Sequence, residues 1–395
     1  MELNDQIKKI AADIYPEIVS IRRHIHANPE LSFEEFETSA YICRILDQWG
    51  VSYKQGIAGT GIVAVIEGNS AGRTIAFRAD MDALPITERN EIPYKSVHEG
   101  KMHACGHDVH TSALLGAIRI LQKLRDSWDG TIKFVFQPGE EKIPGGASLM
   151  LKEKALAPDE PEIIIAQHVF PDMEYGNVGF RAGQYMASSD EIYITVIGKG
   201  GHAALPDKLV DPVLISAHLI TALQQIVSRY AKPGVPTVLS FGKVEAAGAV
   251  NVIPDKVKIE GTFRTMNEEW RKRAHELIRK IAGEIAAGMG GDAEVEIRNG
   301  YPVLFNNPDV TAKARSFAVD FLGAKQVHDL DYRMTAEDFA YFAQKYPATL
   351  FRLGTADPGK QSSALHTSNF NVNEKSIELS MGLLAYMGIS FLKSV

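Results

Sequence analysis

The sequence predicts an α/β protein in which a larger domain, a mostly parallel sheet flanked by helices, carries an inserted α+β domain. In both terminal parts of the chain, short apolar runs typical of buried strands alternate with helical patterns, as in parallel sheets covered on both faces. Between them the order becomes strand, helix, strand, strand, helix, strand, which is the split βαβ or ferredoxin-like arrangement. The length of 395 residues suits two domains. We therefore expect a discontinuous domain of residues 1–182 and 298–395 around an inserted domain of residues 183–297.

The larger domain begins with two amphipathic helical patterns within residues 3–50, which are broken at Asn28-Pro29. Apolar, β-rich runs then alternate with segments of helical spacing and strong helix formers. Strands are expected at 61–66, 74–77, 131–136, 163–167 and 348–353. Helices are expected at 113–122, near 145–154, 309–322 and 336–346, and from Lys375 onward.

The inserted domain begins with residues 191–197, which alternate between apolar and polar like a half-buried strand. A long helical pattern follows from Pro212 to Tyr230. Two further strands, another helix and a last strand complete the order at 237–245, 256–265, 268–289 and 293–298.

Composition excludes several classes of protein. A net charge of −7 argues against a nucleic-acid partner, since phosphate binding needs a basic face. The N-terminus has no basic segment followed by an apolar core, and no apolar run reaches the length of a membrane span. Two cysteines cannot form a disulfide framework, and Cys43 has the spacing of a core residue. We expect a soluble, cytoplasmic protein with no membrane or nucleic-acid partner.

Three segments carry residues that bind divalent transition metals. Cys105 and His107 offer a thiolate and an imidazole two residues apart, and His168 ends an apolar strand. Glu140 and Glu141 follow another strand and a Pro-Gly turn. Because the carboxyl ends of parallel strands meet at one edge of a sheet, we expect these groups to converge. Zn²⁺ accepts all three types of donor.

The pair of adjacent glutamates distinguishes a hydrolytic site from a structural one. Neighbouring side chains point in different directions, so one glutamate can ligate while the other acts as a base toward water. A structural zinc module closes four ligands and needs no base. Asp82 follows a strand and is expected to orient a ligating imidazole, although a turn-forming role is the alternative. The remaining histidines are expected to be structural or supporting (His103, His110) or ordinary surface or packing residues (His24, His26, His98, His218, His275, His328).

Several short motifs follow one another along nearly the whole chain. They run from Arg22–Leu31 through Met102–His110 and Gly200–Pro206 to Asn251–Pro254, Gly261–Thr265 and Leu365–Thr367. Together they resemble the zinc aminoacylase/carboxypeptidase family of metallopeptidases. The resemblance is greatest to the branch of hippurate hydrolase, N-acetyldiaminopimelate deacetylase and auxin-conjugate hydrolases.

The resemblance implies two divalent metal ions per subunit, with Zn, Mn, Co and Ni as candidates, and an inserted domain that serves as lid and dimerisation surface. It assigns Glu140 as the general acid/base, and Cys105 as the ligand shared by both ions. His202 and Arg264, both in the inserted domain, would contact the substrate, and Asn251 could add a donor. The five metal ligands that it implies are Cys105, His107, Glu141, His168 and His366.

The expected activity is hydrolysis of the amide bond in a small N-acyl amino acid, such as an N-acetyl or N-benzoyl derivative, by a homodimer. A dipeptidase or carboxypeptidase on the same scaffold is the nearest alternative, because it differs only in what the acyl pocket accepts. A metal-binding protein that has lost catalysis is the alternative from another class.

Overall fold

The computed structural model describes residues 2–359 and 363–394, which divide into two compact units. The larger unit contains residues Met1–Gly183, Phe305–Asp331 and Asp338–Val395, and the smaller one Gln184–Leu304 and Tyr332–Glu337. The short segment Tyr332–Glu337 was not expected to belong to the smaller unit. Throughout the described residues, no helix has the length and apolar character needed to cross a bilayer.

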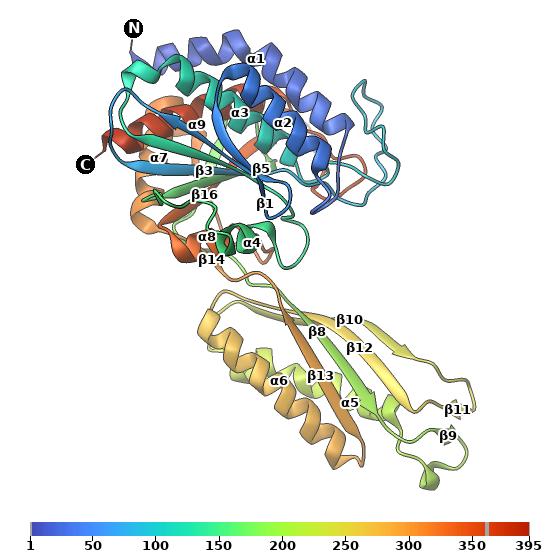
Figure 1. The fold of residues 1–395 in the computed structure, drawn as a ribbon. Helices are drawn as coiled ribbons and strands as arrows, with labels where there is room; N and C mark the ends of the chain where they lie inside the picture. Colours follow the sequence, from blue (N-terminus) through green and yellow to red (C-terminus); the bar gives the residue numbers. More distant parts are fainter. Residues whose placement is uncertain (1, 360–362, 395) are drawn as a thin grey trace. The chain divides into compact units, whose positions relative to one another are not determined.

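The larger unit is built on an eight-stranded sheet whose four central strands, β4, β3, β5 and β16, run parallel (Figure 1). Antiparallel pairing flanks them on both sides, between β2 and β4 and between β16 and β6. The strands in sheet order are β1 (Ser52–Ile57), β2 (Gly61–Glu67), β4 (Thr131–Gln137), β3 (Thr74–Asp80), β5 (Ile164–Glu174), β16 (Ala348–Ala356), β6 (Val178–Phe180) and β15 (Val327–Asp329).

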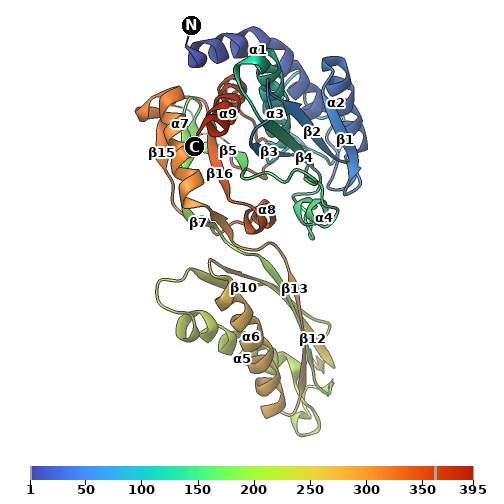
Figure 2. The same cartoon turned by 60° about the vertical axis from the view of Figure 1, so that its left-hand side comes forward.

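Three long helices of the larger unit pack on one another beside this sheet (Figures 1 and 2). They are α1 (Leu3–Ala27), α3 (His107–Lys123) and α9 (Lys375–Lys393). In α1, Ile7, Ile14, Ile18 and Ile25 recur every three to four residues or a multiple of that spacing, and all are buried; this spacing gives an apolar stripe on one side of a helix. The other helices are α2 (Phe36–Trp49), α4 (Gly146–Lys152), α7 (Pro308–Leu322) and α8 (Ala340–Lys345).

The smaller unit has a four-stranded antiparallel sheet in the order β10, β12, β8, β13 (Figure 1). Along β8, buried and half-buried residues alternate, and Ile192, Ile194 and Val196 contribute to a core shared with the two helices. The chain order strand, helix, strand, strand, helix, strand is that of the split βαβ arrangement. The elements are β8 (Asp190–Ile197), α5 (Pro212–Leu223), β10 (Thr237–Ala246), β12 (Lys256–Thr265), α6 (Glu268–Gly288) and β13 (Asp292–Asn299).

The predicted fold class is confirmed, and the differences are unexpected short strands and the limits of some helices. The helix expected at 336–346 covers only Ala340–Lys345. None of the short strands β1, β6, β15, β7 (Gly183–Met186), β9 (Gly201–His202), β11 (Val252–Ile253) and β14 (Leu304–Asn306) was expected. Most of these segments are too short to show a clear apolar period. The six residues of β1 are mostly exposed, so they form no apolar run. Helix α3 starts six residues before the expected Ala113, at His107, and this earlier start makes His107 the first residue of a helix.

Candidate metal centre

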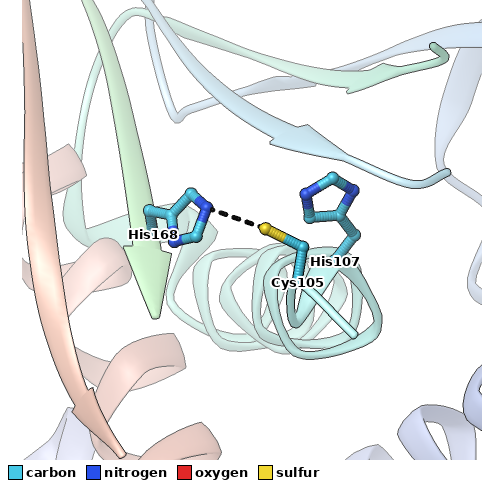
Figure 3. Close-up of side chains that lie close together, drawn as sticks. All are labelled: Cys105, His107 and His168. Atoms are coloured by element: carbon cyan, nitrogen blue, oxygen red, sulfur yellow. Dashed lines mark hydrogen bonds between the residues drawn. The ribbon is translucent and has the colours of Figure 1, made fainter. Parts of the chain in front are cut away.

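Cys105 and His107 lie at the start of α3, and His168 lies on the neighbouring strand β5 (Figure 3). Gly106, between the first two, has a φ of 83°, and a Cβ there would overlap the side chain of Val169. A glycine therefore allows the sharp entry into the helix. The Cys105 Sγ lies 3.4 Å from His168 Nε2, so the two side chains meet although they are far apart in sequence.

Hydrogen bonds set the orientation of both imidazoles. Nδ1 of His107 lies 2.8 Å from the carbonyl oxygen of Asp82 and 3.2 Å from its carboxylate. Nδ1 of His168 lies 2.8 Å from the carbonyl oxygen of Val169. Because Nδ1 donates in each ring, Nε2 is the nitrogen that is left to ligate a metal. Within residues 2–359 and 363–394, Nε2 of His107 is buried and makes no hydrogen bond, as expected of an atom that ligates a metal.

Glu141 and His366 lie on loops beside Cys105. Glu141 Oε1 is 3.2 Å from His366 Nε2, and the Glu141 N–H donates to the Asp82 carboxylate at 3.0 Å. His366 has a φ of 61° and an exposed side chain. Its N–H donates to the carbonyl oxygen of Ala104, which joins the 363–370 loop to the segment that carries Cys105.

Among the groups of possible ligand atoms in the described residues, two share Cys105. In one group, the ligand atoms of Cys105, His107 and His168 lie within 4.8 Å of one another. The same holds for Cys105, Glu141 and His366. Thiolate, imidazole and carboxylate are the ligands of zinc and similar ions. The residues thus fit divalent metal ions, and a shared thiolate suits a pair of ions.

Burial and neighbouring groups shift the pKa values of the centre's donor groups in different directions. Burial raises the pKa of the Cys105 thiol, with Glu141 adding to the effect. Burial lowers the pKa of His168 well below its usual range. Hydrogen bonds with Cys105 and Glu141 raise the pKa of His366 to about 10. A buried thiol among acids is one that a metal ion can hold as thiolate.

Glu140 and Asp82 are the other expected site residues that lie in the larger unit. Glu140 is buried, and a carboxylate oxygen of Glu140 lies within 4.8 Å of ligand atoms of His107 and Glu141. Asp82 is buried and accepts hydrogen bonds from Ser32 Oγ at 2.6 Å and from the Glu141 N–H. Asp82 therefore contacts both His107 and Glu141 and can orient them.

The remaining expected residues belong to the smaller unit. His202 lies on β9, opposite Val252 of β11, and its side chain is exposed. The Ala203 N–H donates to the carbonyl oxygen of Asn251, so Asn251 lies beside His202. Arg264, on β12, is half-buried and donates to the carbonyl oxygen of Met334 at 3.2 Å.

Two buried hydrogen-bond networks lie near the centre, and the partners in them were not predicted. Asp80 lies 2.6 Å from Nδ1 of His110, whose Nε2 accepts the Val169 N–H. His26 was expected to be an ordinary surface or packing residue. Instead its fully buried ring lies 2.8 Å from Asp108 and 3.2 Å from Glu88. Arg22 of the same Arg22–Leu31 motif also donates to Asp108 at 2.7 Å. The presence of His26 in this motif was the signal in the sequence that could have indicated its role.

The chain is similar to several named proteins and to solved structures. The chain is 41% identical over 339 residues to the N-acetyl-L-cysteine deacetylase of Bacillus subtilis, covering 86% of this chain and 80% of the relative. It is 35% identical over 395 residues to thermostable carboxypeptidase 2 of Saccharolobus solfataricus, covering 99% of both. The crystal structure of the Bacillus subtilis YXEP protein, a dinuclear metal-binding peptidase of the M20 family, matches with a TM-score of 0.83 at 31% identity, covering 97% of this chain and all of that one.

The fold, the donor set and these relatives together define a metal-dependent amidohydrolase. Residues 76–387 match the sequence pattern of peptidase family M20/M25/M40. The chain belongs to this family.

Proposed function

We propose that the chain hydrolyses the amide bond of N-acyl amino acids to a carboxylate and a free amino acid. The observation that carries the proposal is the buried Glu140, which lies next to the ligand groups but is not needed in either of them. A hydrolase needs such a base beside its metal ions, whereas a structural site does not. The N-acetyl-L-cysteine deacetylase among the relatives supports this substrate class.

The proposed ligands of the two ions are Cys105, His107, Glu141, His168 and His366. When bound, divalent ions lower the pKa of a water molecule and polarise the scissile carbonyl. Glu140 accepts a proton from the attacking water as its oxygen bonds to the acyl carbon. Glu140 then donates this proton to the leaving nitrogen as the C–N bond breaks. Asp82 keeps His107 and Glu141 in place throughout.

The proposed substrate contacts come from the smaller unit. Arg264 would bind the α-carboxylate through two hydrogen bonds, as guanidinium groups do, with Asn251 as a further donor. His202 would donate to the carbonyl oxygen, where negative charge develops. These contacts fix the scissile bond relative to Glu140.

We also propose that the protein is a cytoplasmic homodimer that associates through residues 183–297, with this domain acting as a lid and with Zn, Mn, Co or Ni in the centre. Several large apolar side chains of this domain are exposed, which supports an interface there: Val213, Leu214, Tyr230, Val244, Val250 and Val252. Size-exclusion chromatography with light scattering would measure the oligomeric state. A monomer at micromolar concentration contradicts this part of the proposal.

The experiment that tests the activity is a substrate panel with each candidate metal. N-acetyl and N-benzoyl amino acids are compared with dipeptides, and metal content is measured alongside. A dipeptidase or carboxypeptidase is the second candidate, favoured by the name of the Saccharolobus relative. Preference for dipeptides by tenfold or more selects that candidate. A metal-loaded protein that cleaves neither class is the non-catalytic alternative.

A further inference from the structure

Residues 31–35, which we call the N-terminal turn, contact the loop that carries Glu140 and Glu141. The turn precedes α2, whose first residues are fixed by Glu30: the Glu30 carboxylate accepts the N–H and the hydroxyl of Thr38, both at 2.8 Å. The Glu30 carbonyl oxygen accepts the N–H of Ala83. The turn is therefore attached both to a helix and to the segment after β3.

The first contact runs through Ser32. Its hydroxyl donates at 2.6 Å to the same Asp82 oxygen that accepts the Glu141 N–H. The turn thus reaches Glu141 through one shared carboxylate oxygen.

The second contact is between Phe33 and Gly139. Phe33 has a φ of 69°, which is uncommon for an aromatic residue. Gly139 has a φ of 59°, and a Cβ on Gly139 would overlap the Phe33 ring. The ring therefore packs directly on the backbone of the residue before Glu140.

The third contact is a buried carboxylate. Glu35 is fully buried, and its Oε1 accepts the N–H of Phe33 at 2.9 Å and of Gly139 at 2.8 Å. Its Oε2 accepts the Thr60 hydroxyl at 2.8 Å. One oxygen atom thus ties the turn to the loop, and the other anchors the side chain to the start of β2.

We propose that Glu35 is a positioning residue, which holds Gly139 and thereby the direction in which Glu140 and Glu141 leave the loop. The role rests on the proposed function of Glu140 and deepens it. Misplacement of a reacting group by about 1 Å can lower turnover roughly 10²-fold, so a hydrogen bond one residue before the base has a direct effect on catalysis. The function of the N-terminal turn is then to hold the loop that carries Glu140 and Glu141.

The raised pKa of the Glu35 carboxylate is consistent with this role. Burial, with the nearby charge of Asp82, raises the pKa of Glu35 to about 7. A buried acid with a raised pKa is costly to keep ionised. The hydrogen bonds that Glu35 accepts from the turn and the loop explain why an acid occupies this buried position.

The test compares Glu35→Ala with Glu35→Gln and Thr60→Val in the metal-loaded enzyme. Glu35→Ala removes the acceptor of the Gly139 N–H, so kcat should fall about 10–100-fold with KM within roughly threefold of the wild type. In Glu35→Gln the amide oxygen can still accept both N–H groups, so kcat should return to within about fivefold of the wild type. Thr60→Val removes only the bond to Oε2 and is the matched control, with kcat expected within about twofold.

Two kinetic results would overturn the proposal: a Glu35→Ala enzyme with unchanged kcat, or a Glu35→Gln enzyme as slow as Glu35→Ala. Ser32→Ala tests the other hydrogen-bonded contact of the N-terminal turn. It removes the hydrogen bond to Asp82 and leaves Glu35 in place. An unchanged kcat in Ser32→Ala, beside a lowered kcat in Glu35→Ala, assigns the positioning to Glu35.

Metal affinity separates failure of this proposal from failure of the proposed function. Because Glu141 lies on the positioned loop, the affinity for Mn²⁺ measured by calorimetry should fall about tenfold in Glu35→Ala and be retained in Glu35→Gln. These Mn²⁺ affinities can be compared even if no N-acyl amino acid is cleaved. Equal Mn²⁺ affinities in the wild type, Glu35→Ala and Glu35→Gln would overturn the positioning role.

Discussion

The charge on Glu35 should make the larger unit less stable as the pH rises, and Glu35→Gln should remove this dependence. The pKa of Glu35 is raised from 4.5 to about 7 in the folded protein. Between these values the folded state binds more protons than the unfolded state, so stability falls as pH rises from 4.5 through 7. At about 1.36 kcal/mol for each pKa unit, the difference amounts to about 3 kcal/mol.

The measurement is urea unfolding of the wild type and Glu35→Gln at several pH values from 5 to 8. Trp49 and Trp128 lie in the larger unit and Trp270 in the smaller one. A Trp270→Phe background therefore makes fluorescence report on the larger unit alone. Shared titrations cancel in the difference between the two proteins, so only the effect of residue 35 remains.

The expected result is a wild type and a variant of similar stability near pH 5, with the variant more stable by about 3 kcal/mol at pH 8. The same experiment is run on metal-loaded and on chelator-treated protein, because metal binding itself depends on pH. A difference between the two proteins that stays constant from pH 5 to 8 refutes the raised pKa, and with it the view that the acid is retained at a cost in stability.

Three further changes test the site and the scaffold. Glu140→Gln should keep the metal and lower kcat about 10²–10⁴-fold; near-wild-type turnover removes Glu140 from the mechanism. Peroxide should oxidise Cys105, release metal and abolish activity, whereas treated protein that keeps both shows that Cys105 is not a ligand. Asp190→Asn should destabilise the smaller unit by about 3–5 kcal/mol, because buried Asp190 is bound by Arg271 at 2.6 Å and His275 at 2.8 Å. Urea unfolding followed by Trp270 fluorescence measures this loss, and a change below about 1 kcal/mol contradicts it.

Much of the fold could be predicted because its main elements have strong periodic patterns. The strand at 131–136 and the helix from Lys375 show continuous apolar runs or regular apolar spacing, and both are present within a residue or so of their expected limits. In contrast, β9 and β11 have two residues each. Their pairing depends on contacts between distant segments, which no local pattern reveals.

Some residues of the candidate site could be predicted from the sequence and others could not. Cys105 precedes a recognisable helix and His168 ends an apolar run, so their convergence could be inferred from the expected α/β arrangement. His366 lies on an irregular loop, and only the family pattern singled it out. The contact between Glu35 and Gly139 joins residues 104 positions apart, and an acid followed by a helix looks like a capping residue in the sequence. Contacts of this kind arise from tertiary packing, so they become visible only in the folded chain.

The two ligand groups differ in how firmly the protein holds them. Cys105, His107 and His168 are buried on a helix and a strand, whereas His366 is half-exposed on a loop with a left-handed backbone. On the proposed ligation, one ion would exchange with solvent slowly and the other quickly, and a chelator would remove them in two phases. A cell short of metal would then contain a half-loaded enzyme that regains activity as soon as the supply recovers, without having to refold.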